Sequence, residues 1–235
     1  MRKTLTALAL ILATSSAVAE TEYPTNPILR PITLMDGTLA VTAGVVAGEE
    51  SDENRKKTFV NLGYGITDNL TIGFGGIKYR FLAREDNKHG LELAVSYGHR
   101  GYNEYLGSND DSVAHGLDLS GKYVFSDDLA MTFGFGAVEW SEDNREDKNE
   151  FRYMVGLQKG LTESWSTGIQ YTYRDLKDFN QNEAHDVNTY LNYVYSKNMD
   201  IGLFASYSSF DAQENGYKLD NNFGRAIGIY ANYRF

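Results

Sequence analysis

The sequence predicts an all-β protein, a closed antiparallel transmembrane β-barrel of 12 strands. Three observations support this prediction. Apolar and polar residues alternate along many stretches, tight turns alternate with long charged loops, and proline is absent from Met35 to Phe235. Proline lacks the N–H that a β-ladder requires, so its absence fits a sheet in which nearly every residue is hydrogen bonded.

The last stretch of the chain shows the alternation clearly. From 226 to 235 the odd-numbered residues are apolar or aromatic, whereas the even-numbered ones include Asn232 and Arg234. The same period recurs in 117–125 and 151–158. A soluble sandwich alternates too, but its strands typically have about 5–6 residues. Because a tilted membrane-spanning strand needs about 9–11 residues, these longer stretches favour a barrel in a membrane.

The N-terminus has the features of a secretory signal peptide. Arg2 and Lys3 precede the apolar run 5–13, and Ala17-Val18-Ala19 provides a small-x-small cleavage site. The alternative is a short membrane anchor, but the run is shorter than the ~20 residues that a spanning helix needs. We expect a signal peptide at 1–19, a periplasmic extension at 20–36 that contains all three prolines, and the barrel at 37–235.

Composition excludes several classes of protein. The chain has no cysteine, so it has neither disulfides nor thiol chemistry. Its 22 basic and 32 acidic residues give a net charge of −10, which argues against a nucleic-acid partner.

Turn lengths predict which end of the barrel faces which compartment. Short turns are expected at 65–70, 83–86, 125–130, 161–166 and 195–200, and long charged loops at 48–57, 103–112, 141–150, 177–186 and 211–222. Bacterial barrels place short turns in the periplasm and long loops outside the cell. Both termini are therefore expected to be periplasmic.

The strand count depends on Gly75-Gly76. Leu70, Ile72 and Phe74 are apolar at even positions, whereas Ile77 and Tyr79 are apolar at odd ones. Such a phase change marks a hairpin or a bulge. A bulge would leave 11 strands or require another near 32–34. A hairpin predicts twelve, at 38–47, 57–66, 69–75, 76–83, 89–101, 113–125, 129–140, 150–160, 164–175, 186–195, 199–210 and 223–235.

Parity also assigns the faces. Lipid-facing residues are expected to include Leu39, Val41, Leu62, Tyr64, Leu93, Val95, Phe133, Phe135, Ile169, Tyr171, Leu191, Tyr193, Leu203, Ala205 and Ile229. Aromatic residues beside the tight turns (Phe125, Trp165, Tyr195, Phe235) and near the loops (Tyr102, Phe151, Tyr173) are expected to form the two interfacial girdles.

The opposite parity gathers charges in the lumen. Basic residues with this parity are Lys78, Arg80, Arg100, Lys122, Arg152, Arg174 and Arg234, and acidic ones are Glu92, Asp118, Glu150 and Asp200. The surplus of basic residues favours anions, if the lumen conducts.

Strand register predicts specific partners among these charges. Turns centred near 86 and 107 would place Arg80 opposite Glu92, Glu92 opposite Lys122 and Asp118 opposite Ser96. We expect an Arg80–Glu92–Lys122 cluster and a separate Glu150–Arg174 pair. The alternative is a set of independent, solvated charges. The clusters could form a charge-selective constriction or an ionic plug, because a 12-stranded barrel lies between filled and open sizes.

The signal peptide, the alternating last strand and the terminal Tyr233-Arg234-Phe235 resemble bacterial outer-membrane β-barrel proteins. The resemblance implies a Gram-negative outer-membrane location among lipid and lipopolysaccharide. It also implies insertion by the barrel-assembly machinery, with Tyr233 and Phe235 in the assembly signal. We expect a monomer, which in size resembles small sugar-acid channels.

No catalytic, metal or cofactor site is expected. His89, His99, His115 and His185 lack metal-ligand spacing. His99 and His115 lie near Ser108, Asn109 and Ser112, yet the motif of outer-membrane phospholipases is missing. Asp110-Asp111 and His185-Asp186 resemble pairs in outer-membrane proteases only faintly.

Three functions are therefore ranked. The first is a small passive channel for small, possibly anionic solutes. The second is a non-conducting structural or surface-interaction barrel with an ion-paired lumen. An outer-membrane hydrolase is a distant third.

Overall fold

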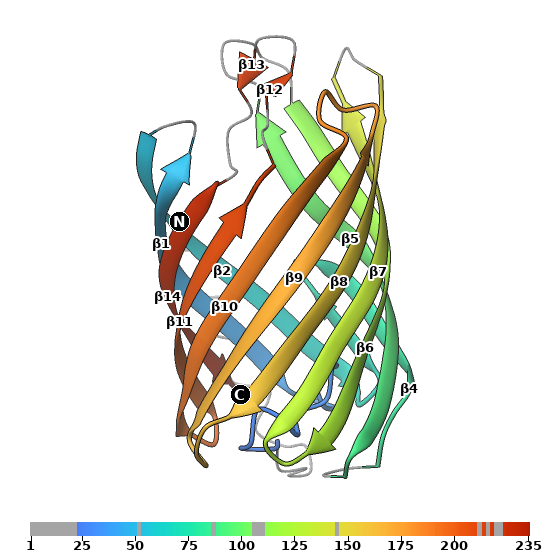
Figure 1. Ribbon diagram of the computed structural model, residues 1–235. Coiled ribbons are helices and arrows are strands. Elements are labelled where there is room, and N and C mark those ends of the chain that lie inside the picture. The colour runs from blue at the N-terminus through green and yellow to red at the C-terminus, as the bar shows by residue number, and fades with distance from the viewer. Residues whose placement is uncertain are drawn as a thin grey trace, which may run out of the picture.

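A computed structural model describes residues 23–50, 53–85, 88–104, 111–143, 146–210, 213–214, 217–218 and 223–235. Twelve strands form one closed antiparallel barrel, in which β1 pairs with β2 on one side and with β14 on the other (Figure 1). The predicted fold class and strand number are confirmed. The described residues contain no helix that is long and apolar enough to cross a membrane.

The barrel strands follow chain order around the wall. They are β1 Leu39–Glu50, β2 Glu53–Thr67, β3 Leu70–Gly73, β4 Gly76–Leu82, β5 Gly90–Glu104, β6 Asp111–Ser126, β7 Leu129–Glu142, β8 Lys148–Gly160, β9 Trp165–Lys177, β10 Glu183–Ser196, β11 Met199–Ser208 and β14 Arg225–Arg234. Two short strands, β12 Gln213–Glu214 and β13 Tyr217–Lys218, form a separate sheet. Several barrel strands run further into the long loops than expected, because the antiparallel ladder continues past the apolar segment.

The two ends of the barrel differ in their connections. Tight turns and the C-terminus lie at one end, and β12 and β13 lie beyond the other (Figure 1). We call these the turn end and the loop end. The assignment of the turn end to the periplasm remains a prediction.

The phase change near Gly75 is a hairpin. Gly73 of β3 pairs with Gly76 of β4, so the two turn residues are Phe74 and Gly75. The expected turn at Gly75-Gly76 was therefore one residue too far along the chain. Gly76 has φ +115°, and a Cβ there would lie 2.1 Å from the backbone oxygen of Tyr97 on β5. Glycine is required at this position because both the φ value and the neighbouring strand exclude a side chain.

Gly76→Ala is therefore expected to lower the free energy of unfolding by about 2 kcal/mol or more. A left-handed backbone costs about 1–2 kcal/mol for an ordinary residue, and the clash adds to this cost. Gly75→Ala is the matched control, since a Cβ at Gly75 would meet nothing within 4 Å. Urea unfolding followed by circular dichroism should separate the two variants, and equal stabilities would contradict the hairpin geometry.

The outer face of the wall is apolar. Leu203 is 50% exposed and Ile229 49% on the protein alone, as expected for side chains that contact lipid. Other predicted lipid-facing or girdle residues that lie exposed are Tyr64, Tyr102, Phe125, Phe135, Trp165, Ile169, Tyr171, Tyr195 and Phe235. On the inner face, glycines make room for aromatic rings: a Cβ at Gly202 or Gly228 would overlap the ring of Tyr230 or Phe204.

The segment 23–36, which precedes β1, enters the barrel at the turn end (Figure 1). Ile28 is 1% exposed and packs against Val124 and Ala130 of the inner wall. Thr33 donates a hydrogen bond from its hydroxyl to the backbone oxygen of Asp68 at 2.7 Å. Nothing in the sequence had indicated that this segment fills part of the lumen.

Candidate functional site

The charged lumen is the candidate site, and its charges gather in four groups from the turn end to the loop end. The first group joins the entering segment to the barrel. Arg30 contacts Asp200 of β11 with both terminal nitrogens, at 2.5 Å and 3.0 Å. Arg234 of β14 contacts the same carboxylate at 2.6 Å. This geometry holds the segment against the wall through a bidentate, charge-assisted contact.

Tyr23 completes the first group. Its ring lies 5.8 Å from the Arg30 guanidinium and 5.0 Å from that of Arg234. Burial raises the pKa of the Tyr23 hydroxyl above its ordinary value, so the side chain stays neutral. A neutral ring between two cations strengthens the attachment by cation–π contact.

The second group surrounds Glu92 of β5. Arg80 contacts Glu92 at 3.2 Å and Arg84 contacts it at 3.1 Å. The backbone N–H of Ile32 donates to the other carboxylate oxygen at 3.0 Å, so this group also holds the entering segment. Glu92 is 1% exposed, and two hydrogen bonds together with the Arg84 guanidinium compensate its buried charge.

The register around Glu92 differs in part from the prediction. The β4–β5 hairpin turns later in the chain than predicted: Leu82 pairs with Leu93 and, across a bulge, Arg80 pairs with Ala94. The direct cross-strand pairing of Arg80 with Glu92 was therefore wrong, although the ion pair forms. Lys122 does lie opposite Glu92, but its ammonium donates to the backbone oxygen of Arg30 at 2.9 Å. Arg84, which the sequence placed only in a turn, supplies the second cation.

The third group lies on β5 and β6. Arg100 donates to Asp118 at 2.6 Å from Nε, and to the backbone oxygen of Gly75 at 3.0 Å. Ser96 lies opposite Asp118 as predicted and donates to it at 3.3 Å. Lys78 of β4 is the neighbour of Ser96 on the other side.

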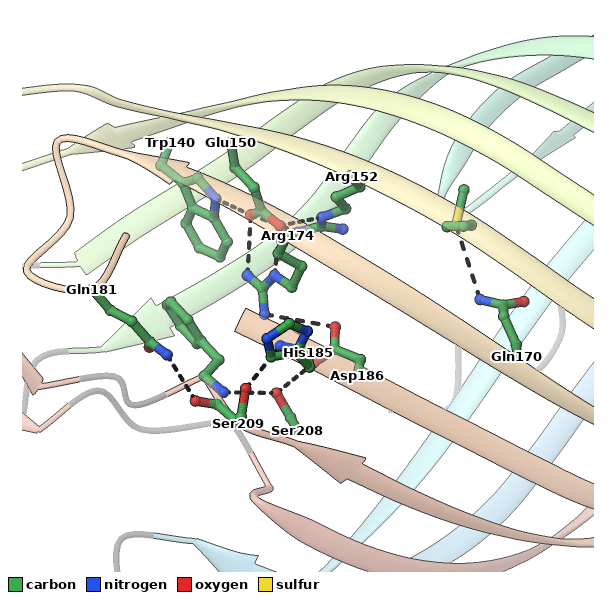
Figure 2. Close-up of polar contacts among 12 residues, drawn as sticks. Trp140, Glu150, Arg152, Gln170, Arg174, Gln181, His185, Asp186, Ser208 and Ser209 are labelled. Carbon is green, nitrogen blue, oxygen red and sulfur yellow. Dashed lines mark hydrogen bonds and ion pairs between the residues drawn. The ribbon is translucent and has the colours of Figure 1, made fainter. Parts of the chain in front are cut away.

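The fourth group lies near the loop end and is built on Glu150 of β8 (Figure 2). Arg174 donates to both carboxylate oxygens at 2.5 Å and 3.0 Å, and Arg152 does so at 2.6 Å and 3.1 Å. The indole N–H of Trp140 donates to Glu150 at 3.0 Å. The predicted Glu150–Arg174 pair is present, as part of a larger network.

An apolar cover lies over the fourth group. The ring of Phe210 lies 4.3 Å from the Arg174 guanidinium, and Phe179 makes edge contacts with Trp140 and Phe210. The side-chain amide of Gln181, before β10, donates a hydrogen bond to the backbone oxygen of Ser209, after β11, at 2.9 Å (Figure 2). The loop end is thus narrowed by aromatic side chains, and the turn end by the entering segment.

A cavity of about 530 Å³ remains between these two ends. Polar residues of β1 to β5 line it together with the entering segment, and they include Thr42, Asn61, Thr71, Lys78, Ser96 and Arg100. Asn61, which lines this cavity, and Asn188 of β10 face the interior and are exposed, so the lumen is accessible to solvent at these positions.

The interior groups and the cavity together hold nine basic and five acidic side chains. The basic ones are Arg30, Lys78, Arg80, Arg84, Arg100, Lys122, Arg152, Arg174 and Arg234; the acidic ones are Glu92, Asp118, Glu150, Asp186 and Asp200. All eleven charges predicted for the lumen are among them. Arg30, Arg84 and Asp186 were missed, the first two because they lie outside strands.

The residues considered for catalysis do not converge. His99 and His115 face each other across β5 and β6 with rings 6.0 Å apart, on exposed positions of the outer parity, whereas Ser112 is buried. His185 contacts the hydroxyl of Tyr171, and its neighbour Asp186 accepts from Ser208 inside the barrel. Ser108, Asn109 and Asp110 lie outside the described residues. No group of three metal-ligating side chains occurs in the described ranges.

A family model for the outer membrane protein beta-barrel domain matches residues 5–196. The chain belongs to this family. Comparison with curated protein sequences gives no match. The family and the fold indicate the outer membrane of a Gram-negative bacterium.

A solved porin structure has the same type of fold. The NanC porin aligns over 83% of this chain and 98% of its own, with 12% identity and a TM-score of 0.58. An anion-selective porin from Comamonas acidovorans covers 84% and 98% at 11% identity, with a TM-score of 0.48. The OmpT outer membrane protein of Vibrio cholerae covers 84% and 96% at 12% identity, with a TM-score of 0.47. At 12% identity the likeness to the NanC porin shows the fold alone.

Proposed function

We propose that this barrel is a narrow passive channel for small anionic solutes. The surplus of four positive charges among the described side chains of the four groups and the cavity is the observation that carries the proposal. Charged rings and clusters set the preference of a pore because they attract one sign of ion and repel the other. The polar cavity between the two narrowed ends provides space for a solute.

The proposal includes low conductance. The entering segment reduces the opening at the turn end, and the Trp140–Phe179–Phe210 contacts reduce it at the loop end. Solutes would pass in a dehydrated or compact form, between walls whose charges are mostly paired. Such a pore is expected to discriminate strongly between solutes and to conduct slowly.

Ion selectivity is the direct test. The purified mature protein is inserted into a planar bilayer that separates two concentrations of potassium chloride. We expect the sign of the reversal potential to show that chloride is more permeant than potassium. Raising the ionic strength should weaken the preference, because salt screens the lumen charges. A preference for potassium over chloride would contradict the proposal.

The second candidate is a non-conducting structural or surface-interaction barrel. The buried ion-pair networks and the narrowed ends favour it. It predicts no conductance even after removal of the entering segment, together with envelope defects in cells that lack the protein. An enzymatic role is not part of either proposal.

The proposed setting follows the sequence. The signal peptide exports the chain, the turn end faces the periplasm, and the monomer lies among lipid and lipopolysaccharide. Tyr233 and Phe235 are 40% and 46% exposed on the outer face, with rings 4.6 Å apart. They are therefore accessible for the proposed recognition by the assembly machinery.

A further inference from the structure

Lys78 differs from the other basic side chains of the lumen. Each of the other eight contacts a carboxylate or a backbone carbonyl. Lys78 forms no hydrogen bond or ion pair with any residue that the structure describes. It lies on the cavity wall, in register with Thr71 of β3 and Ser96 of β5. Its positive charge is therefore available to a ligand.

The cavity around Lys78 has the size and the polarity of a binding site. Its volume of about 530 Å³ falls within the range of about 300–1,000 Å³ that is usual for small-molecule sites. Thr42, Asn61, Thr71 and Ser96 supply hydroxyl and amide groups, and Lys78, Arg100 and Asp118 give a net charge of +1. Pro31 and Leu34 of the entering segment form an apolar wall.

We propose that this cavity binds a small organic anion, with its carboxylate or phosphate at Lys78 and its hydroxyls against the polar wall. The site refines the proposed channel and rests on it, because the ligand must enter the lumen. A cation that is removed from bulk water without a partner is costly, and an anionic oxygen offsets that cost by a charge-assisted hydrogen bond. Because Arg100 already donates a hydrogen bond to Asp118, Lys78 is the primary contact for the anionic group of the ligand.

Titration calorimetry of the detergent-solubilised, folded protein tests the site. The probes are glycerate, glycerol 3-phosphate and glycerol, which share a three-carbon skeleton and differ in the anionic group. At least one anion is expected to bind, and glycerol is not. The anion that binds more tightly identifies the preferred group, whereas equal binding of glycerol or no binding of either anion would overturn the proposal.

Three variants separate a binding role from a structural one. Lys78→Met should weaken anion binding by about tenfold or more, the effect of losing one charged contact. Asp118→Asn should strengthen it severalfold, because the net charge of the cavity rises. Lys56→Met, an exposed lysine with no partner among the described residues, should change nothing. An unchanged affinity in Lys78→Met would refute the site.

The outcome is distinguishable from that of the channel proposal. Calorimetry in detergent does not require ion flow through a membrane. A protein that conducts chloride but binds neither anion would refute the site alone. A protein that binds an anion at Lys78 but does not conduct would refute the channel alone.

Discussion

Deleting residues 20–34 from the mature chain is expected to raise the single-channel conductance severalfold. This deletion removes Tyr23, Arg30 and Ile32, which attach the entering segment to the inner wall at the turn end. The barrel itself should persist, because Glu92 remains paired with Arg80 and Arg84. Asp200 likewise remains paired with Arg234. Neither of these two carboxylates is left buried without a cation.

Planar-bilayer recording of the deletion variant measures this effect. Asp200→Asn should give a smaller increase, because it removes the carboxylate that holds Arg30 but keeps the segment. Asp128→Asn is the control, since Asp128 is a carboxylate exposed in a tight turn. If the deletion leaves the conductance unchanged, the segment does not obstruct the path. If the deletion variant shows no conductance at all, the result supports the non-conducting barrel over the channel.

Glu150→Ala is expected to lower the free energy of unfolding by about 3–5 kcal/mol. The substitution leaves Arg152 and Arg174 without their shared carboxylate, and the indole N–H of Trp140 without its acceptor. Removal of one partner from a buried ion pair costs this much because the remaining charge stays buried. Asp186, 3.9 Å from Arg174, offers only a distant replacement.

Urea unfolding in lipid vesicles, followed by circular dichroism, measures the loss. Glu163→Ala, which removes an exposed glutamate in a tight turn, is the matched control and should stay within about 0.5 kcal/mol of the parent. Glu150→Gln keeps the shape of the side chain, so its free energy of unfolding should lie between those of Glu150→Ala and Glu163→Ala. A stability of Glu150→Ala equal to that of the control would show that the network is solvated rather than buried.

Local pattern determined the barrel and its two faces. Alternation with a period of two places Leu203 outside and Asp200 inside whatever the neighbouring strands are, because successive side chains of a strand point to opposite faces. The phase change at Gly75 indicated a hairpin or a bulge, and the pairing of β3 with β4 confirms the hairpin and so the even number of strands. The sequence prediction placed the turn one residue too late, because Gly75 and Gly76 fit the local pattern equally well. Only the close approach of Gly76 to β5 distinguishes the two glycines.

Only the tertiary structure decided how the lumen charges are partnered and where the segment before β1 lies. Cross-strand register predicted Ser96 opposite Asp118. The β4–β5 hairpin turns later than predicted and pairs Arg80 with Ala94, and long side chains reach partners outside their register. The segment 23–36 has no alternation that could indicate its position. It lies in the lumen because Arg30 and Ile32 meet Asp200 and Glu92, carboxylates that are far away in the sequence and adjacent only once the barrel has closed.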